Sequence, residues 1–318
     1  MIYAATEEHI RNAAAIINAG GLVAFPTETV YGLGADALNP VAAAKIFEVK
    51  NRPFFDPLIV HIPDRSWADR LSVDIHKNAA ALMEAFWPGP LTIVVKKNDS
   101  LPDILTAGLD TVALRMPSHP VALALLRYAG TPIAAPSANP FGYLSPTTAG
   151  HVASQLGGSI DMILDGGPCS VGIESTILRA DASGITLLRA GGTPVEAIES
   201  IAGTVISAEH SPAPQSPGQL PYHYSPRTPV KIIEDLSEAV LPDSGLLSLY
   251  RPEDVKKFRS VEVLSEKGDL TEAASRFFHC LHLLDAAECS TIYALPVPEV
   301  GLGRAIMERL RKAAARTP

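Results

Sequence analysis

The sequence predicts an α/β protein in which a sheet covered by helices is followed by a second, smaller α/β unit. Short apolar runs alternate with helical patterns along most of the 318 residues. A proline-rich segment, Ser211–Pro229, interrupts this alternation once. Hydrophobic residues make up 47% and charged residues 19% of the chain, a composition typical of well-packed globular domains rather than of disorder.

The alternation begins with a helix predicted over Glu7–Asn18, for which Thr6 is a suitable N-cap. A buried strand follows over Gly21–Phe25, and Val41–Lys50 has a helical pattern that cannot continue through Pro53. Further strands are predicted over Leu58–Ile62, Leu91–Val95, Val112–Arg115, Ile133–Ala135, Met162–Leu164, Ser175–Leu178 and Ile185–Arg189. Further helices are predicted over Ile75–Phe86 and Pro120–Tyr128.

The segment Ser211–Pro229 has six prolines in 19 residues, which excludes a regular helix or an inner strand. A plain linker is one interpretation. The segment also contains Tyr222, His223, Tyr224 and Arg227, which are unusual in a flexible spacer. The alternative is therefore a segment that docks on another part of the protein.

After this segment, strands are predicted over Val230–Glu234, Gly245–Leu249, Ser260–Leu264 and Thr291–Leu295, and helices over Thr271–Ala287 and Gly303–Ala315. This pattern is typical of a small doubly wound domain. We therefore predict three parts: a catalytic domain over residues 1–205, a linker or lid over 206–229, and a C-terminal domain over 230–318.

Charge and cysteine content restrict the partners and the compartment. The net charge is −8, and both the first 205 residues and the remainder are net negative, so tightly bound nucleic acid is not expected. The three cysteines are widely spaced and indicate neither disulfides nor a protein-held metal site. The sequence contains no stretch typical of a signal peptide or membrane span, and we expect a cytoplasmic protein.

Several polar motifs follow predicted strands. The segment Phe25–Gly34 combines hydroxyls with glycines, which suits a small polar ligand or simply a tight turn. Lys50 and Arg52 could clamp phosphates, although cations also favour a helix C-terminus. His61 ends an apolar strand, where a core histidine is the commoner interpretation, and a buried Arg115 would need a substrate carboxylate or a structural acid as partner.

Two later loops carry similar chemistry. Ser137 and Asn139 follow a strand, where their side chains suit phosphate or ribose, or local backbone bonds. The glycine-rich stretch Asp165–Ile177 is not a Walker A loop, and its Cys169 has no neighbouring histidine and is not expected to be a nucleophile. Arg189 precedes another glycine and supplies a further cation.

Together these motifs resemble one family. The order PTETVYGLG, KNRP, PLIVH, LRMP, SANP, EST and LRAG is similar to the Sua5/YrdC/YciO family, and Lys50-x-Arg52 with Ser137-x-Asn139 resembles its KxR…SxN signature. The stretch SPGQLPYHYSP resembles the linker of the Sua5 branch. The resemblance implies a YrdC-like twisted open sheet with helices and a small Rossmann-like C-terminal Sua5 domain.

The resemblance also implies an activity: formation of threonylcarbamoyl-AMP and pyrophosphate from L-threonine, bicarbonate and ATP, for the t6A modification of tRNA. Mg²⁺ would enter with ATP, and a separate transferase complex would act downstream on tRNA. Lys50 and Arg52 would be catalytic. The implied threonine-binding residues are Thr29, His61, Arg115, Ala135 and Ser175. The implied ATP-binding residues are Lys50, Arg52, Asp56, Thr111, Ser137, Asn139, Ser145, Arg189, His223 and Tyr224.

Asp56 departs from the family pattern, in which Asn is frequent at this position. A carboxylate near phosphates is repulsive unless it binds Mg²⁺ or turns away. Two other functions remain as alternatives: another carbamoyl- or nucleotide-processing enzyme of this fold, and a non-catalytic RNA-binding or ribosome-maturation protein. The acidic charge disfavours the second alternative.

Overall fold

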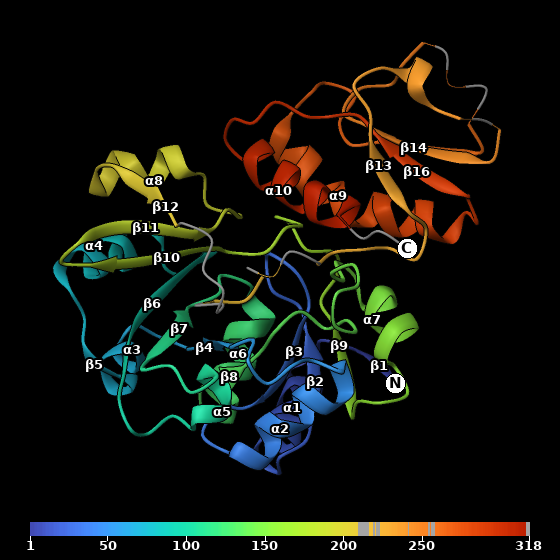
Figure 1. The fold of residues 1–318 in the computed structure, drawn as a ribbon. Coiled ribbons are helices and arrows are strands. Elements are labelled where there is room, and N and C mark those ends of the chain that lie inside the picture. The colour runs from blue at the N-terminus through green and yellow to red at the C-terminus, as the bar shows by residue number, and fades with distance from the viewer. Residues whose placement is uncertain are drawn as a thin grey trace.

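The structure, a computed structural model, describes residues 1–208, 216–218, 220, 223–240, 242–253, 255 and 258–315. Much of the predicted linker or lid, including Tyr222, lies outside the described residues. The described residues form a large sheet in the first part of the chain and a small sheet in the last part (Figure 1).

The large sheet is mixed and has twelve strands. Its main path has the order β1-β9-β2-β3-β8-β4-β7-β6-β10-β11-β12, and β5 pairs with β6. The strands are β1 (Ile2–Ala4), β2 (Val23–Phe25), β3 (Gly32–Asp36), β4 (Ile59–His61), β5 (Ser72–Asp74), β6 (Leu91–Lys97), β7 (Thr111–Arg115), β8 (Ile133–Ala134), β9 (Met162–Asp165), β10 (Thr176–Asp181), β11 (Gly184–Arg189) and β12 (Val205–Ser207). The central strands β4, β7 and β8 are buried, which fixes the residues at their ends.

Helices cover this sheet: α1 (Glu7–Asn18), α2 (Pro40–Lys50), α3 (Ser66–Leu71), α4 (Lys77–Phe86), α5 (Asp103–Thr106), α6 (Pro120–Ala129), α7 (Ala149–Leu156) and α8 (Val195–Ala202). Local capping explains where the longer ones begin. The Thr6 hydroxyl accepts a hydrogen bond from the His9 amide at the start of α1, and Asn39 caps α2 directly before Pro40. At its C-terminus α2 stops at Asn51, which has a left-handed φ of 51°.

The small sheet is parallel, with the order β13-β16-β14-β15. Its strands are β13 (Val230–Ile232), β14 (Ser244–Ser248), β15 (Ser260–Val263) and β16 (Thr291–Ala294), joined by the short 3-10 helix η1 (Leu236–Glu238) and by α9 (Leu270–Ala286) and α10 (Gly303–Ala314). Figure 1 shows α9 and α10 between the small sheet and the large one. These two helices therefore form the contact layer.

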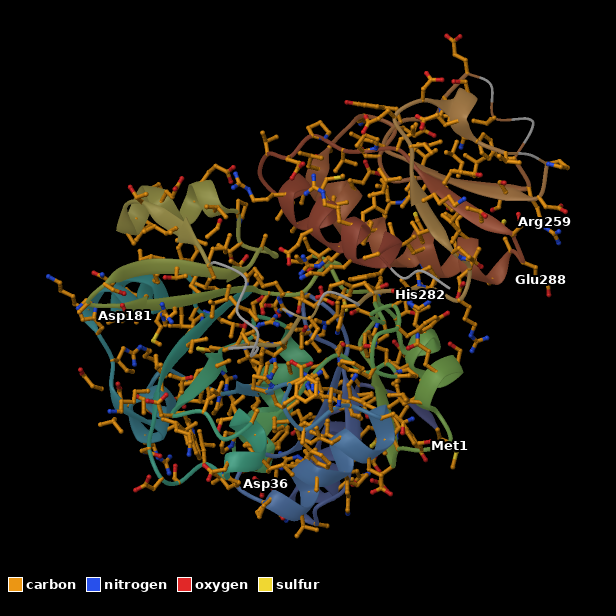
Figure 2. The ribbon with its side chains drawn as sticks, viewed as in Figure 1. Met1, Asp36, Asp181, Arg259, His282 and Glu288 are labelled. Carbon is orange, nitrogen blue, oxygen red and sulfur yellow. The ribbon has the colours of Figure 1, made fainter. Side chains whose placement is uncertain are left out.

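The contact between helices α9 and α10 and the part of the chain that forms the large sheet is polar as well as apolar. Asp285 of α9 accepts hydrogen bonds from the Tyr143 hydroxyl and from the Thr228 amide. Gly172 has a φ of 74°, and a Cβ there would lie 2.4 Å from the backbone of Ser275 in α9, so only glycine allows this approach. Figure 2 shows His282 at this junction, where its Nε2 lies 3.2 Å from the Ser145 carbonyl.

The predicted α/β class is confirmed, and the predicted helices and strands form with shifts of a few residues at their ends. Nine of the described elements were not predicted: β1, β3, α3, β5, α5, α7, α8, β12 and η1. In the described part of the chain, no helix has the length and apolarity needed to cross a bilayer.

Candidate active site

A pocket with a cavity volume of about 40 Å³ lies where several strands of the large sheet end. His61 closes β4, Arg115 closes β7, and Ala135 directly follows β8. Of the predicted site residues, the following line the pocket: Thr29, Arg52, His61, Arg115, Ala135, Ser137, Ser175, Arg189, His223 and Tyr224. The structure therefore brings together residues from both predicted subsites.

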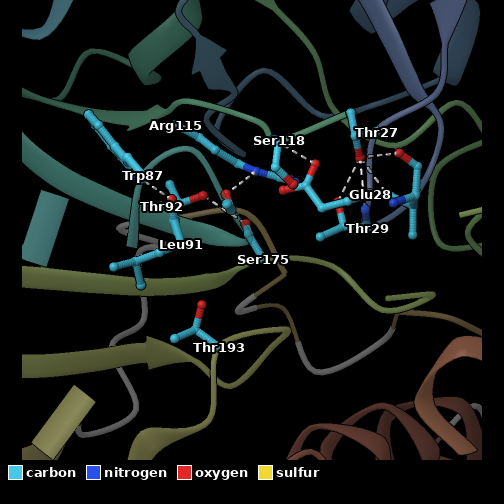
Figure 3. Close-up of polar contacts among 12 residues, drawn as sticks. Thr27, Glu28, Thr29, Trp87, Leu91, Thr92, Arg115, Ser118, Ser175 and Thr193 are labelled. Carbon is cyan, nitrogen blue, oxygen red and sulfur yellow. Dashed lines mark hydrogen bonds and ion pairs between the residues drawn. The ribbon is translucent and has the colours of Figure 1, made fainter. Parts of the chain in front are cut away.

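The turn between β2 and β3 supplies buried hydroxyls to the pocket. The Thr27 hydroxyl accepts from the amides of Thr29 and Val30 at 3.1 and 3.2 Å and donates to the Val30 carbonyl at 2.7 Å. Its oxygen also lies 2.8 Å from the Thr29 hydroxyl (Figure 3). These bonds fix the turn and hold Thr29 at the pocket wall.

Arg115 points toward Glu28, as Figure 3 shows. Its Nη2 donates to Glu28 Oε1 at 2.7 Å, and the other carboxylate oxygen accepts from the Ser118 amide at 3.1 Å. Its Nε donates to the Gly89 carbonyl at 3.3 Å. Glu28 thus fixes the guanidinium, and sequence reasoning missed it because its partner is 87 residues away.

Ser175 connects the floor of the pocket to Arg189. Its hydroxyl lies 2.7 Å from that of Thr92, as Figure 3 shows. Arg189 donates to the Ser175 carbonyl from Nε at 3.1 Å and from Nη2 at 2.9 Å. A Cβ at Gly191 would lie 2.3 Å from the Ser175 backbone, so the glycine permits this close packing.

Arg52 also lines the pocket and is 6% exposed. Its Nη2 lies 2.8 Å from Asp56 Oδ2 and donates to the Pro57 carbonyl at 2.8 Å, and its Nε donates to the Asp56 carbonyl. Burial lowers the pKa of Arg52, Asp56 opposes this, and the nearby Arg189 lowers the pKa further. Arg52 and Arg189 thus bring two buried guanidiniums to one pocket, an arrangement that suits an anion.

An extended Lys-x-Arg stretch would point Lys50 and Arg52 the same way, into the pocket. In the structure Lys50 does not line the pocket. It is the last residue of α2, and its ammonium donates to the backbone carbonyls of Ser137 and Asn139. Burial, followed by the charge of Arg52, lowers the pKa of Lys50 well below its ordinary value. Lys50 therefore holds the loop that carries Ser137 into the pocket.

Four other predicted residues lie outside the pocket lining. Asp56 is fully buried behind Arg52, and burial raises the pKa of its carboxyl. The Asn139 amide donates to the carbonyls of Pro140 and Tyr143. Ser145 donates to Glu174. Thr111 begins β7, four residues and roughly 13 Å along the strand from Arg115.

Glu174 is a pocket residue that sequence reasoning did not single out. It accepts from the Ser145 hydroxyl, and its Oε2 lies 2.7 Å from Nε of Arg309 in α10. Burial opposes its ionisation, but Arg309, Arg189 and the Ser145 hydrogen bond together hold its pKa at about 2. The carboxylate is therefore charged at neutral pH, and the EST motif was its only sequence signal.

Four linker residues line the pocket: Pro217, Gly218, His223 and Tyr224. Tyr224 is 1% exposed and has a φ of 62°, a strained conformation for an aromatic residue. Within the described residues, the Tyr224 hydroxyl and His223 Nδ1 have no hydrogen-bond partner. Burial raises the pKa of Tyr224 and lowers that of His223 to about 3. Unpaired buried polar groups at a pocket wall indicate a polar ligand.

His61 and Cys169 are weak candidates for proton transfer or covalent chemistry. Burial, followed by the charge of Arg115, lowers the pKa of His61 to about 3, so the imidazole is neutral at pH 7. Cys169 is 4% exposed, and burial raises the pKa of its thiol. Among the described residues, no group of three or more His, Cys, Asp or Glu side chains is arranged to hold a metal ion.

Comparison with known proteins assigns both parts of the chain. A family profile described as "Telomere recombination", for Sua5, YciO and YrdC, matches residues 15–191, and one described as "Threonylcarbamoyl-AMP synthase, C-terminal domain" matches residues 193–315. The chain is 41% identical to threonylcarbamoyl-AMP synthase of Pyrococcus abyssi, covering 96% of this chain and 94% of that one. For the same enzyme of Bacillus subtilis the values are 42%, 97% and 93%.

Solved structures agree with the sequence matches. The crystal structure of P. abyssi Sua5 complexed with L-threonine superposes with a TM-score of 0.91 at 38% identity, covering 99% of this chain and 96% of that one. A P. abyssi Sua5 variant altered at a His and a neighbouring Tyr gives the same values. Because both the sequence and the fold match over nearly their full length, the chain belongs to the Sua5/YrdC/YciO family.

Proposed function

We propose that this chain is a threonylcarbamoyl-AMP synthase that uses L-threonine, bicarbonate and ATP. The observation that carries the proposal is one pocket lined by Arg115, Thr29 and Ser175 together with Arg52, Arg189 and Ser137. The first group suits an amino acid, and the second suits phosphates. The names of the relatives from Pyrococcus and Bacillus support the same reaction.

In this proposal Arg115 binds the threonine carboxylate. Glu28 and Gly89 already hold its Nη2 and Nε, so the guanidinium is oriented before the substrate arrives. Thr29 and Ser175 supply hydroxyls to the polar groups of threonine. His61, neutral because its pKa is about 3, packs against this subsite without adding charge.

Arg52, Arg189 and Ser137 bind the triphosphate, and His223 and Tyr224 of the linker cover the nucleotide. Lys50 acts on this subsite through the backbone of Ser137 and Asn139. Mg²⁺ would enter with ATP and would neutralise part of the charge on its phosphates. Glu174 is the acidic side chain in the described pocket lining, and it is already paired with Arg309. This pairing favours a metal ion held mainly by the phosphates of the substrate.

The reaction needs positioning and charge neutralisation more than covalent catalysis. The threonine amine and bicarbonate give a carbamate and water. A carbamate oxygen then attacks the α-phosphorus, and the bond to the β,γ-pyrophosphate breaks. The two guanidiniums neutralise charge on the pyrophosphate. The mixed anhydride is labile in water. Cover by the linker protects it from hydrolysis until it passes to a separate tRNA-modifying complex.

The test mixes protein, Mg-ATP, threonine and ¹³C-bicarbonate, and measures pyrophosphate together with the mass of the adenylate. We expect pyrophosphate release that requires threonine, an adenylate one mass unit heavier than with ordinary bicarbonate, and loss of both in Lys50→Ala and Arg52→Ala. Lys45→Ala is the matched control, since Lys45 lies on α2 but donates to the Gly20 carbonyl away from the pocket. Pyrophosphate release without threonine would instead indicate a plain ATPase.

A further inference from the structure

The largest fully buried side chain of the described residues, Arg309, belongs to α10 beside the small sheet, yet it contacts Glu174, which lines the pocket. Its Nε lies 2.7 Å from Oε2 of Glu174. Its Nη1 donates to the carbonyls of Ala190 and Ala305 at 2.8 and 3.0 Å. One guanidinium therefore joins α10 to the wall of the candidate active site.

Glu174 connects Arg309 to residues of the pocket lining. Its other oxygen accepts from the Ser145 hydroxyl, and the next residue, Ser175, binds Arg189 through its carbonyl and hydroxyl. The Arg309 guanidinium also lies 5.4 Å from the ring centroid of Tyr224, the buried linker residue with a left-handed backbone. A displacement of Arg309 would thus disturb two walls of the pocket.

Neighbouring residues of α10 contact the same walls. Glu308 accepts from the Ala190 amide at 3.0 Å. Lys312 donates to Glu308 at 2.7 Å and to the carbonyl of Gly218, a linker residue that lines the pocket. One face of α10 therefore holds both the loop after Arg189 and the linker.

The charges explain why a cation is required at position 309. Glu174 lines a pocket whose proposed ligand is a polyanion, so an unpaired carboxylate would repel it. Four other groups face this carboxylate: Arg189 of β11, His223 and Tyr224 of the linker, and the Ser145 hydroxyl. Without Arg309 the carboxylate would compete with phosphate for Arg189.

We propose that Arg309 is a positioning residue for the nucleotide half of the site: acting through Glu174, it keeps Arg189 available for phosphate and makes α10 part of the enzyme's active architecture. This inference rests on the proposed function. Loss of the pairing displaces groups that must align with the triphosphate, and such misplacement costs about ten- to a hundredfold.

The test compares four variants: Arg309→Met, Glu174→Gln, the double variant and Arg311→Met. Arg311 is the matched control, two residues further along α10, where it pairs with Glu299 at the surface. We expect Arg309→Met to raise the KM for ATP about ten- to a hundredfold while the KM for threonine changes less than about twofold. Because Arg309 acts through Glu174, the double variant should be no worse than Glu174→Gln. Arg311→Met should match the wild type.

A pH profile separates positioning from a general loss of structure. In Arg309→Met the pKa of the buried Glu174 should rise, so kcat/KM for ATP, relative to the wild type at the same pH, should recover as the pH falls and the carboxyl becomes neutral. The Glu174→Gln background should remove this change, since no carboxyl remains there to titrate.

Three results would overturn the inference. The first is a folded Arg309→Met with an ATP KM within about twofold of the wild type, and the second is a multiplicative loss in the double variant. If Arg309→Met does not fold, the charge-neutral double variant decides, and an ATP KM there more than about twofold above that of Glu174→Gln is the third. If the wild type itself lacks threonine-dependent pyrophosphate release, the proposed function fails. Calorimetric ATP binding to wild type and Arg309→Met then tests this inference alone.

Discussion

The pair formed by Glu28 and Arg115 gives the sharpest prediction for the amino-acid subsite. Glu28→Gln keeps the shape of the side chain but provides one acceptor oxygen where the carboxylate provides two. In the structure both oxygens are used, one by Arg115 Nη2 at 2.7 Å and one by the Ser118 amide at 3.1 Å. The new amide group must therefore face one of these two donors with its own N–H groups.

The size of the effect follows from that conflict. Both side chains of the pair are nearly inaccessible, at 4% and 6% exposure, so water does not replace the lost bond. Losing a hydrogen bond to a charged group and leaving a buried donor unpaired costs about 2 kcal/mol. If the misoriented guanidinium stabilises the transition state less by the same free energy, kcat/KM for threonine falls roughly thirtyfold.

The assay is pyrophosphate release with threonine varied at saturating ATP, and then with ATP varied at saturating threonine. The threonine KM should rise and the ATP KM should stay near the wild-type value, while the midpoint of thermal unfolding falls. Glu7→Gln is the control, because Glu7 also pairs with an arginine but is exposed. A normal threonine KM in Glu28→Gln would refute the idea that Glu28 orients Arg115.

Three further predictions concern charge in the pocket. Asp56→Asn should keep or lower the ATP KM, because backbone carbonyls still hold Arg52, and a large increase would mean that the carboxylate has a direct role. The free energy of unfolding should fall as the pH drops below about 6.5, because the buried His61 has a pKa of about 3 and takes up a proton only on unfolding. Urea titrations at several pH values should show a shallower fall in His61→Gln. Arg189→Met should raise the ATP KM more than the threonine KM in steady-state assays, and equal increases would contradict its place at the phosphates.

Most of the fold could be predicted because the elements carry local signals. Capped, periodic segments such as Glu7–Asn18 gave helices close to their observed bounds. Strand β3 was not predicted, because its glycines have no side chains to form an alternating pattern. Their role depends on distant packing: a Cβ at Gly34 would lie 2.8 Å from both Phe25 and Ile133. The short helices α7 and α8 have too few turns for a clear period.

The site could be predicted only in part, for a similar reason. Motifs at strand ends identified Arg115 and Arg189, because strands that run in the same direction end at one edge of a sheet, and the segment after α2 identified Arg52. The acids that orient these cations were not identified. Glu28 and Glu174 find their partners 87 and 135 residues away, and such pairings become visible only once the chain is folded.

The central claim is that threonine and ATP occupy two ends of one pocket. A non-reactive ligand that joins threonine to adenosine through a carbamoyl sulfamate tests this directly, by competition binding. The account predicts that saturating threonine and saturating ATP each displace the ligand, and that Arg115→Ala and Arg52→Ala each weaken it. Undiminished binding of the ligand in the presence of either substrate would contradict the single pocket.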